Sequence, residues 1–128
     1  MEQNKFELFV DDDLKIIHYH HRGLLKVEEI GEAWKSLLSM HEFTDLHYNL
    51  LTDYSEADFD FSISKTDLIW EFLYSIKHIL SGKKEAVITS KPVSTAISML
   101  FESETLKNLN FSVKTFTTKN AAMEWLTR

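Results

Sequence analysis

The chain has 128 residues, of which 44% are hydrophobic, and its net charge is −6 at pH 7. This length and composition predict one domain over residues 1–128 with a buried core, because no stretch rich in Gly, Ser or Pro suggests a linker. The acidic balance argues against nucleic acid as a partner, since phosphate binding needs Lys and Arg gathered on one surface. The absence of cysteine from the sequence excludes disulfide bonds and thiolate chemistry.

Further motifs are missing from the sequence. No apolar stretch is long enough for a membrane span, and the first residues do not resemble a signal peptide. A nucleophile elbow, a glycine-rich phosphate loop and a paired acid and base are also absent. We therefore expect a cytoplasmic, non-enzymatic protein without a cofactor.

The first half of the chain begins with two strand-like segments, 5–10 and 14–21. Three aspartates at 11–13 separate them and suit a tight reversal, so the pair is predicted to form a hairpin. Apolar residues then recur at helical spacing and predict a helix over 26–40. A short apolar stretch predicts a third strand over 46–53.

The second half alternates helices with strands. Apolar residues at helical spacing predict a second helix over 68–80. A β-branched strand follows over 85–90, and Pro92 suits the first turn of a third helix. The segment 111–116 alternates apolar and polar residues as a strand does, and Thr118 can cap a last helix.

The element order β-β-α-β-α-β-α-β-α predicts an α/β fold. Strands that alternate with helices pair in parallel through right-handed crossovers, so we expect a mostly parallel sheet in sequential strand order. If each crossover steps in the same direction, the helices lie mainly on one face. The other face is then partly open, and Leu51 and Val87 on it could form a homodimer contact. Scattered apolar surface residues are the alternative.

Four segments carry a resemblance to a known family: the surroundings of Trp34, the strand NLLTD, the strand and turn EAVITSKP, and the ending VKTFTTKNAAMEWL. In these segments the chain resembles the SpoIIAA-like family, relatives of the STAS domain grouped near the lipid-binding CRAL-TRIO proteins. The resemblance spans nearly the whole chain. It implies a superhelix of βα units with strands in sequential order.

The resemblance also implies a phosphorylation site. In anti-sigma-factor antagonists of the STAS type, a partner kinase phosphorylates a serine at the start of the second helix. The corresponding region here is FDFSISKTD, where Ser62, Ser64 and Thr66 lie at or near the helix start. Amides at a helix start favour a phosphate there. The alternative is that Ser64 caps the helix, with Asp67 completing an approximate capping box.

The ends of the predicted parallel strands give a second candidate region. Segments that follow parallel strands emerge along one edge of the sheet, where open α/β folds bind ligands. As a candidate ligand or partner edge we expect Asp53, Tyr54, Ser90, Lys91, Thr117 and Thr118. Lys91 beside a helix start could hold an anion, or it could be an ordinary surface lysine.

No metal site is predicted. The acid-rich segment 52–67 lacks the glycine and the bidentate glutamate of an EF-hand loop, so we interpret it as a polar loop with solvated acids. His18 and His20 share one face of a strand, and His47 could lie on the next strand. No cysteine or clear carboxylate partner completes a ligand set with them.

Two function classes stay open. The favoured one is a non-enzymatic regulatory or protein-interaction domain with an unknown protein partner, modulated by phosphorylation near the start of the second helix. The alternative is a carrier or sensor of a lipid or other small apolar ligand, as the CRAL-TRIO kinship implies. Such a carrier needs a cavity of several hundred cubic ångströms. We favour the first because every strong apolar segment already has a use in closing the core.

Overall fold

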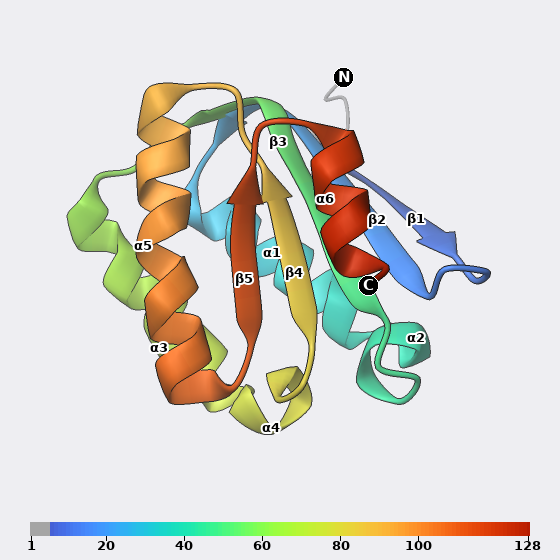
Figure 1. Ribbon diagram of the computed structural model, residues 1–128. Helices are drawn as coiled ribbons and strands as arrows, with labels where there is room; N and C mark the ends of the chain where they lie inside the picture. Colours follow the sequence, from blue (N-terminus) through green and yellow to red (C-terminus); the bar gives the residue numbers. More distant parts are fainter. Residues whose placement is uncertain (1–5) are drawn as a thin grey trace, which may run out of the picture.

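A five-stranded sheet organises the chain in the computed structural model, which describes residues 6–128 except for the side chains of Ile63, Ser103, Glu104 and Leu106 (Figure 1). The strands are β1 (Phe6–Asp11), β2 (Ile16–Leu25), β3 (Asn49–Phe59), β4 (Lys84–Ile88) and β5 (Ser112–Phe116). The helices are α1 (Val27–Leu38), α2 (His41–Thr44), α3 (Thr66–Ser75), α4 (Lys77–Leu80), α5 (Pro92–Leu109) and α6 (Lys119–Leu126), and a 3₁₀ turn, η1 (Ile63–Lys65), precedes α3. The long elements follow the predicted order, and the short segments α2, η1 and α4 are added to it.

The strands lie side by side in chain order, but the sheet is mixed. β1 pairs antiparallel with β2, whereas β2, β3, β4 and β5 pair in parallel. The prediction of a mostly parallel sheet is therefore corrected. The reason is the short turn at 11–13, because two parallel strands need a crossover of a dozen or more residues between them.

Helices cover both faces of the sheet (Figure 1). The main core packs Leu50 and Val87 of the sheet against apolar residues of α1, α3 and α5. A smaller core on the opposite face packs Leu51 against Ala122 and Leu126 of α6. The prediction of helices mainly on one face missed α6. This helix follows the last strand, so no crossover fixes the face on which it packs.

The homodimer contact expected from the sequence cannot use Leu51 and Val87 together. In the register of β3 and β4, Leu51 lies opposite Ala86 and Thr52 lies opposite Val87. Leu51 and Val87 therefore point to opposite faces of the sheet. Both are buried, with exposed fractions of 2% and 6%.

β3 is longer than predicted. It extends to Phe59, so the first part of the segment 52–67 is strand and not polar loop. The strand passes the end of β4, because its pairing with β4 ends at Asp53 while its pairing with β2 continues to Phe59. The acids that suggested a loop, Glu56 and Asp58, are exposed on this extension.

A β-bulge interrupts the pairing of β2 and β3. The register shifts between His20 and Arg22, so that Tyr54 and Ser55 of β3 stand against the single residue His21 of β2. An extra residue in one strand reverses which side chains face the core beyond it. Ala57, which is fully buried in the main core, therefore faces the same helices as Leu50.

The start of α6 gives a test of the fold. Thr118 caps this helix as predicted, because its hydroxyl accepts a hydrogen bond from the amide of Ala121 at 3.2 Å. Thr118→Ala should lower the free energy of unfolding by about 1 kcal/mol, measured by urea denaturation. Thr117→Ala, at the exposed neighbouring position, is the control and should change it by less than about 0.5 kcal/mol. Equal losses in both variants would contradict the cap.

Candidate functional site

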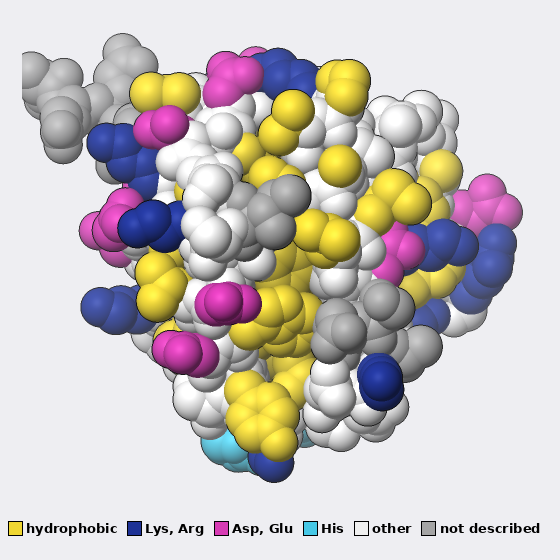
Figure 2. All heavy atoms as spheres, turned by 90° about the vertical axis from the view of Figure 1, so that its left-hand side faces the viewer, with side chains coloured by type: hydrophobic (Ala, Val, Ile, Leu, Met, Phe, Trp, Pro, Cys, Tyr) yellow, Lys and Arg dark blue, Asp and Glu magenta, His cyan; other side chains and the backbone are white. Residues whose placement is uncertain are grey.

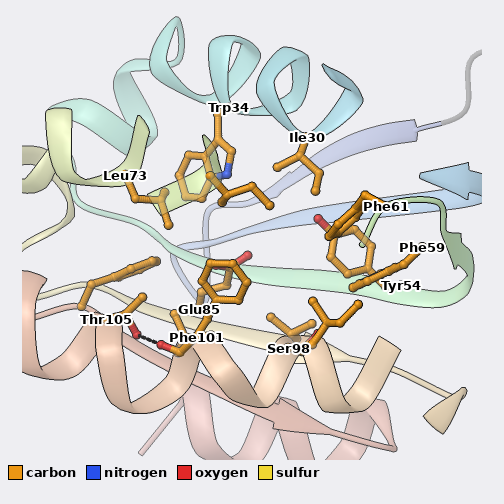
Figure 3. A pocket seen from close by; sticks show the side chains of 15 residues that line it. Ile30, Trp34, Tyr54, Phe59, Phe61, Leu73, Glu85, Ser98, Phe101 and Thr105 are labelled. Atoms are coloured by element: carbon orange, nitrogen blue, oxygen red, sulfur yellow. Dashed lines mark hydrogen bonds between the residues drawn. The ribbon is translucent and has the colours of Figure 1, made fainter. Parts of the chain in front are cut away.

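A cavity of about 70 Å³ lies between the sheet and the layer formed by α1, α3 and α5 (Figure 3). Its lining is mostly apolar, and the polar side chains in it are Tyr54, Glu85, Ser98 and Thr105. Figure 2 shows hydrophobic side chains gathered in a hollow on the face of the molecule that carries α3 and α5. There the partly exposed rings of Trp70 and Phe101 stack across the two helices, with centroids 5.1 Å apart.

Glu85 brings a carboxyl group into this cavity from the middle of the sheet (Figure 3). Alternation along β4 places Glu85 on the same face as Val87, toward the helices, while Ala86 faces α6. The Thr52 hydroxyl on β3 donates a hydrogen bond to Glu85 Oε2. Burial raises the pKa of Glu85 from 4.5 to about 7, although the bond from Thr52 opposes the shift. The carboxyl group therefore holds its proton to a higher pH than an ordinary glutamate does.

Aromatic rings form one wall of the cavity. Tyr54 projects from the bulge of β3 and Phe59 from the end of the same strand, and their ring centroids lie 5.3 Å apart in an edge-to-face contact. Phe61 stacks on Phe59, also at 5.3 Å. Burial raises the pKa of Tyr54 well above its usual value, so its hydroxyl stays protonated and can donate a hydrogen bond. The wall therefore combines aromatic faces with a hydrogen-bond donor.

A second polar group, Tyr19 with His21, lies behind this wall. His21 is fully buried, and its Nε2 lies 3.0 Å from the Leu24 carbonyl. A carbonyl can only accept, so Nε2 carries the proton and Nδ1 accepts the bond from the Tyr19 hydroxyl at 3.2 Å. Both rings contact the Tyr54 ring, with centroids 5.9 Å away for Tyr19 and 6.5 Å for His21. These contacts fix the orientation of Tyr54.

The predicted ligand or partner edge divides into separate groups. Ser90 and Lys91, after β4, hold the extended end of β3: the Ser90 hydroxyl donates to the Ser55 carbonyl at 2.6 Å, and Lys91 Nζ donates to the Ala57 carbonyl at 3.2 Å. Lys91 also forms an ion pair with Asp58. Its ammonium group thus already has two partners within the chain.

The other predicted edge residues point elsewhere. Tyr54 faces the cavity. The carboxylate of Asp53 accepts a hydrogen bond from the Ser55 amide at 2.9 Å, inside the bulge. Thr117 is exposed beside the cap of α6, which Thr118 forms. The structure thus brings Asp53, Ser90 and Lys91 together around the bulged end of β3.

The start of α3 differs from the expected cap. The residue that precedes the helix is Lys65, and no side-chain hydrogen bond caps α3. The prediction that Ser64 caps it is therefore wrong. The turn η1 displaces Ser64 from the capping position. The Ser64 hydroxyl lies 2.7 Å from the Ser62 hydroxyl. Ser62 and Ser64 are exposed, whereas Thr66 is only 7% exposed.

The histidines considered as metal ligands lie in separate environments. His47 Nδ1 is 3.1 Å from Lys83 Nζ, and His20 Nε2 is 3.0 Å from Glu56 Oε1. Among the side chains that the structure describes, no group of three or more His, Asp or Glu is placed to hold a metal ion. In the described part of the chain, no helix has the length and apolar character needed to cross a membrane.

The mixed sheet in sequential strand order, with helices on both faces, defines an α/β protein with a SpoIIAA-like fold. One solved structure that shares it is an uncharacterised protein of the DUF3478 family with a SpoIIAA-like fold from Shewanella loihica PV-4. It is 15% identical in sequence, has a TM-score of 0.66, and the match covers 98% of each chain.

A second similar structure is the anti-sigma factor antagonist SpoIIAA in its unphosphorylated form. The identity is 9% and the TM-score 0.59, and the match covers 94% of this chain and 96% of that one. Neither the protein-family models nor the curated protein sequences give a match. The similarity thus establishes the fold.

Sequence reasoning did not identify Glu85 as part of a site. The sequence predicted only that residues 85–90 form a strand, and in the structure Glu85 of this strand faces the helices. The segment KEAVI did indicate the direction of Glu85. Glu85 and Val87 are two residues apart, so in a strand both side chains point to the same face. The aromatic residues Phe59 and Phe61 were missed because they were assigned to a loop.

Glu85 should make stability depend on pH. Its pKa is higher in the folded protein than in the unfolded chain, so the folded state binds the proton more tightly. The free energy of unfolding should therefore fall as pH rises from about 4.5 to about 7 and then level off. Glu85→Gln removes this dependence and should be the more stable protein at pH 8, by up to roughly 3 kcal/mol.

Urea unfolding at pH 5 and pH 8 checks this prediction. Glu124→Gln, at an exposed position on α6, is the matched control and should follow the pH dependence of the natural sequence. A stability difference between Glu85→Gln and the natural sequence that is the same at both pH values would contradict a Glu85 carboxyl group that binds its proton more tightly in the folded protein.

Proposed function

We propose that the chain is a non-enzymatic regulatory domain of the cytoplasm that acts by binding a protein partner. The observation that carries this proposal is the fold shared with SpoIIAA, an anti-sigma factor antagonist, over nearly the whole length of both chains. A protein with that role acts on other proteins. The domain, residues 1–128, would work in the same way.

The partner surface proposed is the start and outer side of α3. Ser62 and Ser64 are exposed just before this helix, and Leu68 in its first turn is 51% exposed. Tyr74, near the end of the helix, is also exposed. Exposed apolar and aromatic side chains next to polar ones are common in protein interfaces.

The bulged end of β3 supports this surface from the sheet side. Ser90 and Lys91 bind its carbonyl groups, so the chain leaves the sheet toward Ser62 from a fixed point. In this proposal Asp53, Ser90 and Lys91 position the partner surface, and the ammonium group of Lys91 remains paired with Asp58.

Phosphorylation of Ser62 or Ser64 would regulate partner binding. A phosphate adds about 1.5 to 2 negative charges at pH 7. It would stand close in sequence to Asp60 and Asp67, and near the exposed Leu68. Added charge opposes the burial of an apolar side chain in an interface, so the phosphorylated form should bind the partner more weakly.

The lipid-carrier alternative is not favoured by the size of the cavity. Pockets for drug-sized ligands are on the order of 300–1,000 Å³, and the cavity beneath α3 and α5 has about 70 Å³. A lipid chain inside this cavity would need the helices to separate from the sheet, and the larger hollow of about 470 Å³ at Trp70 and Tyr74 is an open surface that would leave such a chain exposed to water.

Affinity purification of the tagged chain from its native host tests the proposed function. A protein should be retained by the natural sequence and by Leu14→Asp, a matched control at an exposed leucine in the β1–β2 turn. Leu68→Asp should lose that protein, because it places a charge in the proposed interface. Retention by all three chains, or by none, would contradict the proposed surface.

Intact-mass and peptide analysis of the same material tests the regulation. We expect a phosphate on Ser62 or Ser64 and none on Thr66, since Thr66 is buried. The double variant Ser62→Ala, Ser64→Ala should lack the phosphate, and the control Ser39→Ala, at an exposed serine after α1, should keep it. A phosphate on Thr66, or none on either serine, would be evidence against this switch.

A further inference from the structure

The carboxyl group of Glu85 has little to balance its charge. Thr52 donates one hydrogen bond to it, and a carboxylate can accept about four. No Lys or Arg lines the cavity among the described residues. An ionised carboxylate in an apolar site is costly unless an opposite charge pairs with it. A ligand with a positive charge would supply the opposite charge that the cavity lining lacks.

The aromatic wall favours the same kind of ligand. The rings of Trp34, Tyr54, Phe59, Phe61 and Phe101 line the cavity around Glu85 (Figure 3). The face of an aromatic ring attracts a cation, and organic ammonium ions are bound in proteins by cages of such rings. A carboxylate combined with several aromatic side chains therefore selects for an apolar group that carries an ammonium ion.

The volume of the cavity limits the size of that ligand. About 10–15 Å³ of such space holds one water molecule, so 70 Å³ has room for roughly five of them. This is the space of a short chain of about five non-hydrogen atoms. The polar side chains Ser98 and Thr105 of α5 lie at the same cavity. The Thr105 hydroxyl already donates to the Phe101 carbonyl at 2.6 Å, so toward a ligand it can act only as an acceptor.

We propose that this cavity is a binding site for a small organic ammonium ion, with Glu85 pairing with the ammonium group and the aromatic wall enclosing the apolar part. The net charge of −6 also favours the approach of a cation. This ligand goes beyond the proposed function, because it needs neither the partner nor the phosphate.

n-Butylamine is a suitable probe, since it joins a short apolar chain to one ammonium group. Calorimetric titration at pH 8 should show binding to the natural sequence, and Glu85→Gln should bind at least about tenfold more weakly. 1-Butanol has the same shape without the charge. It should bind the natural sequence more weakly than n-butylamine does, and should not distinguish the natural sequence from Glu85→Gln.

A second measurement does not depend on any variant. The affinity of the natural sequence for n-butylamine should rise between pH 6 and pH 8, because Glu85 loses its proton in this range while the amine stays protonated. NMR spectra should show the shift changes at Tyr54 and Phe59.

Three results would overturn the proposal: no binding of n-butylamine at millimolar concentration, equal affinity in the natural sequence and Glu85→Gln, or equal affinity for n-butylamine and 1-butanol. The last of these would show an apolar site that does not recognise charge. None of them bears on the partner experiment, since Ser62 and Leu68 do not line the cavity.

Discussion

The β-bulge between β2 and β3 is the constraint on which the site depends. With Tyr54 and Ser55 together opposite His21, the residues that face the helices change from even to odd numbers along β3. Without the extra residue, Glu56 and Asp58 would point into the core, and Ala57 and Phe59 would point away from it. The bulge therefore keeps the acids in solvent and continues the apolar face beyond the end of β4.

Because β3 extends beyond the end of β4, its backbone needs other hydrogen-bond partners at the sheet edge. β4 no longer pairs with β3 after Asp53, so carbonyl groups of the extension need other donors. Ser90 and Lys91 supply them, at Ser55 and Ala57. The residues predicted as a ligand edge thus hold in place the strand that bears the aromatic wall. In this way the edge and the cavity form one structural unit.

Sequence patterns predicted those parts of the fold that depend on local periodicity. The helical spacing of Ile30, Trp34 and Leu37 was sufficient to predict α1, because all three side chains pack into the main core. The extension of β3 was not predictable in this way, since the bulge breaks the alternation and acids interrupt the apolar residues. The face of the sheet on which α6 packs and the direction of the Glu85 side chain depend on strand register and packing. Local sequence patterns do not specify these features.

α3 links the two proposals in space. Its start and outer side carry Ser62, Ser64 and the exposed Leu68, while its inner side contributes Ile69 and Leu73 to the cavity wall. A ligand inside the cavity would contact the inner side of the helix whose outer side we propose as the partner surface. The proposed partner surface and the cavity thus lie on opposite sides of one helix.

The central claim is that Glu85 is a carboxyl group facing an apolar cavity, and its titration tests this most directly. The carbon chemical shift of the Glu85 carboxyl group, followed by NMR from pH 3 to pH 9, would give its pKa in the folded protein. The structure predicts a midpoint at about pH 7. A midpoint at the ordinary value of 4.5 would show that the carboxyl group is solvated, and it would contradict the cavity site.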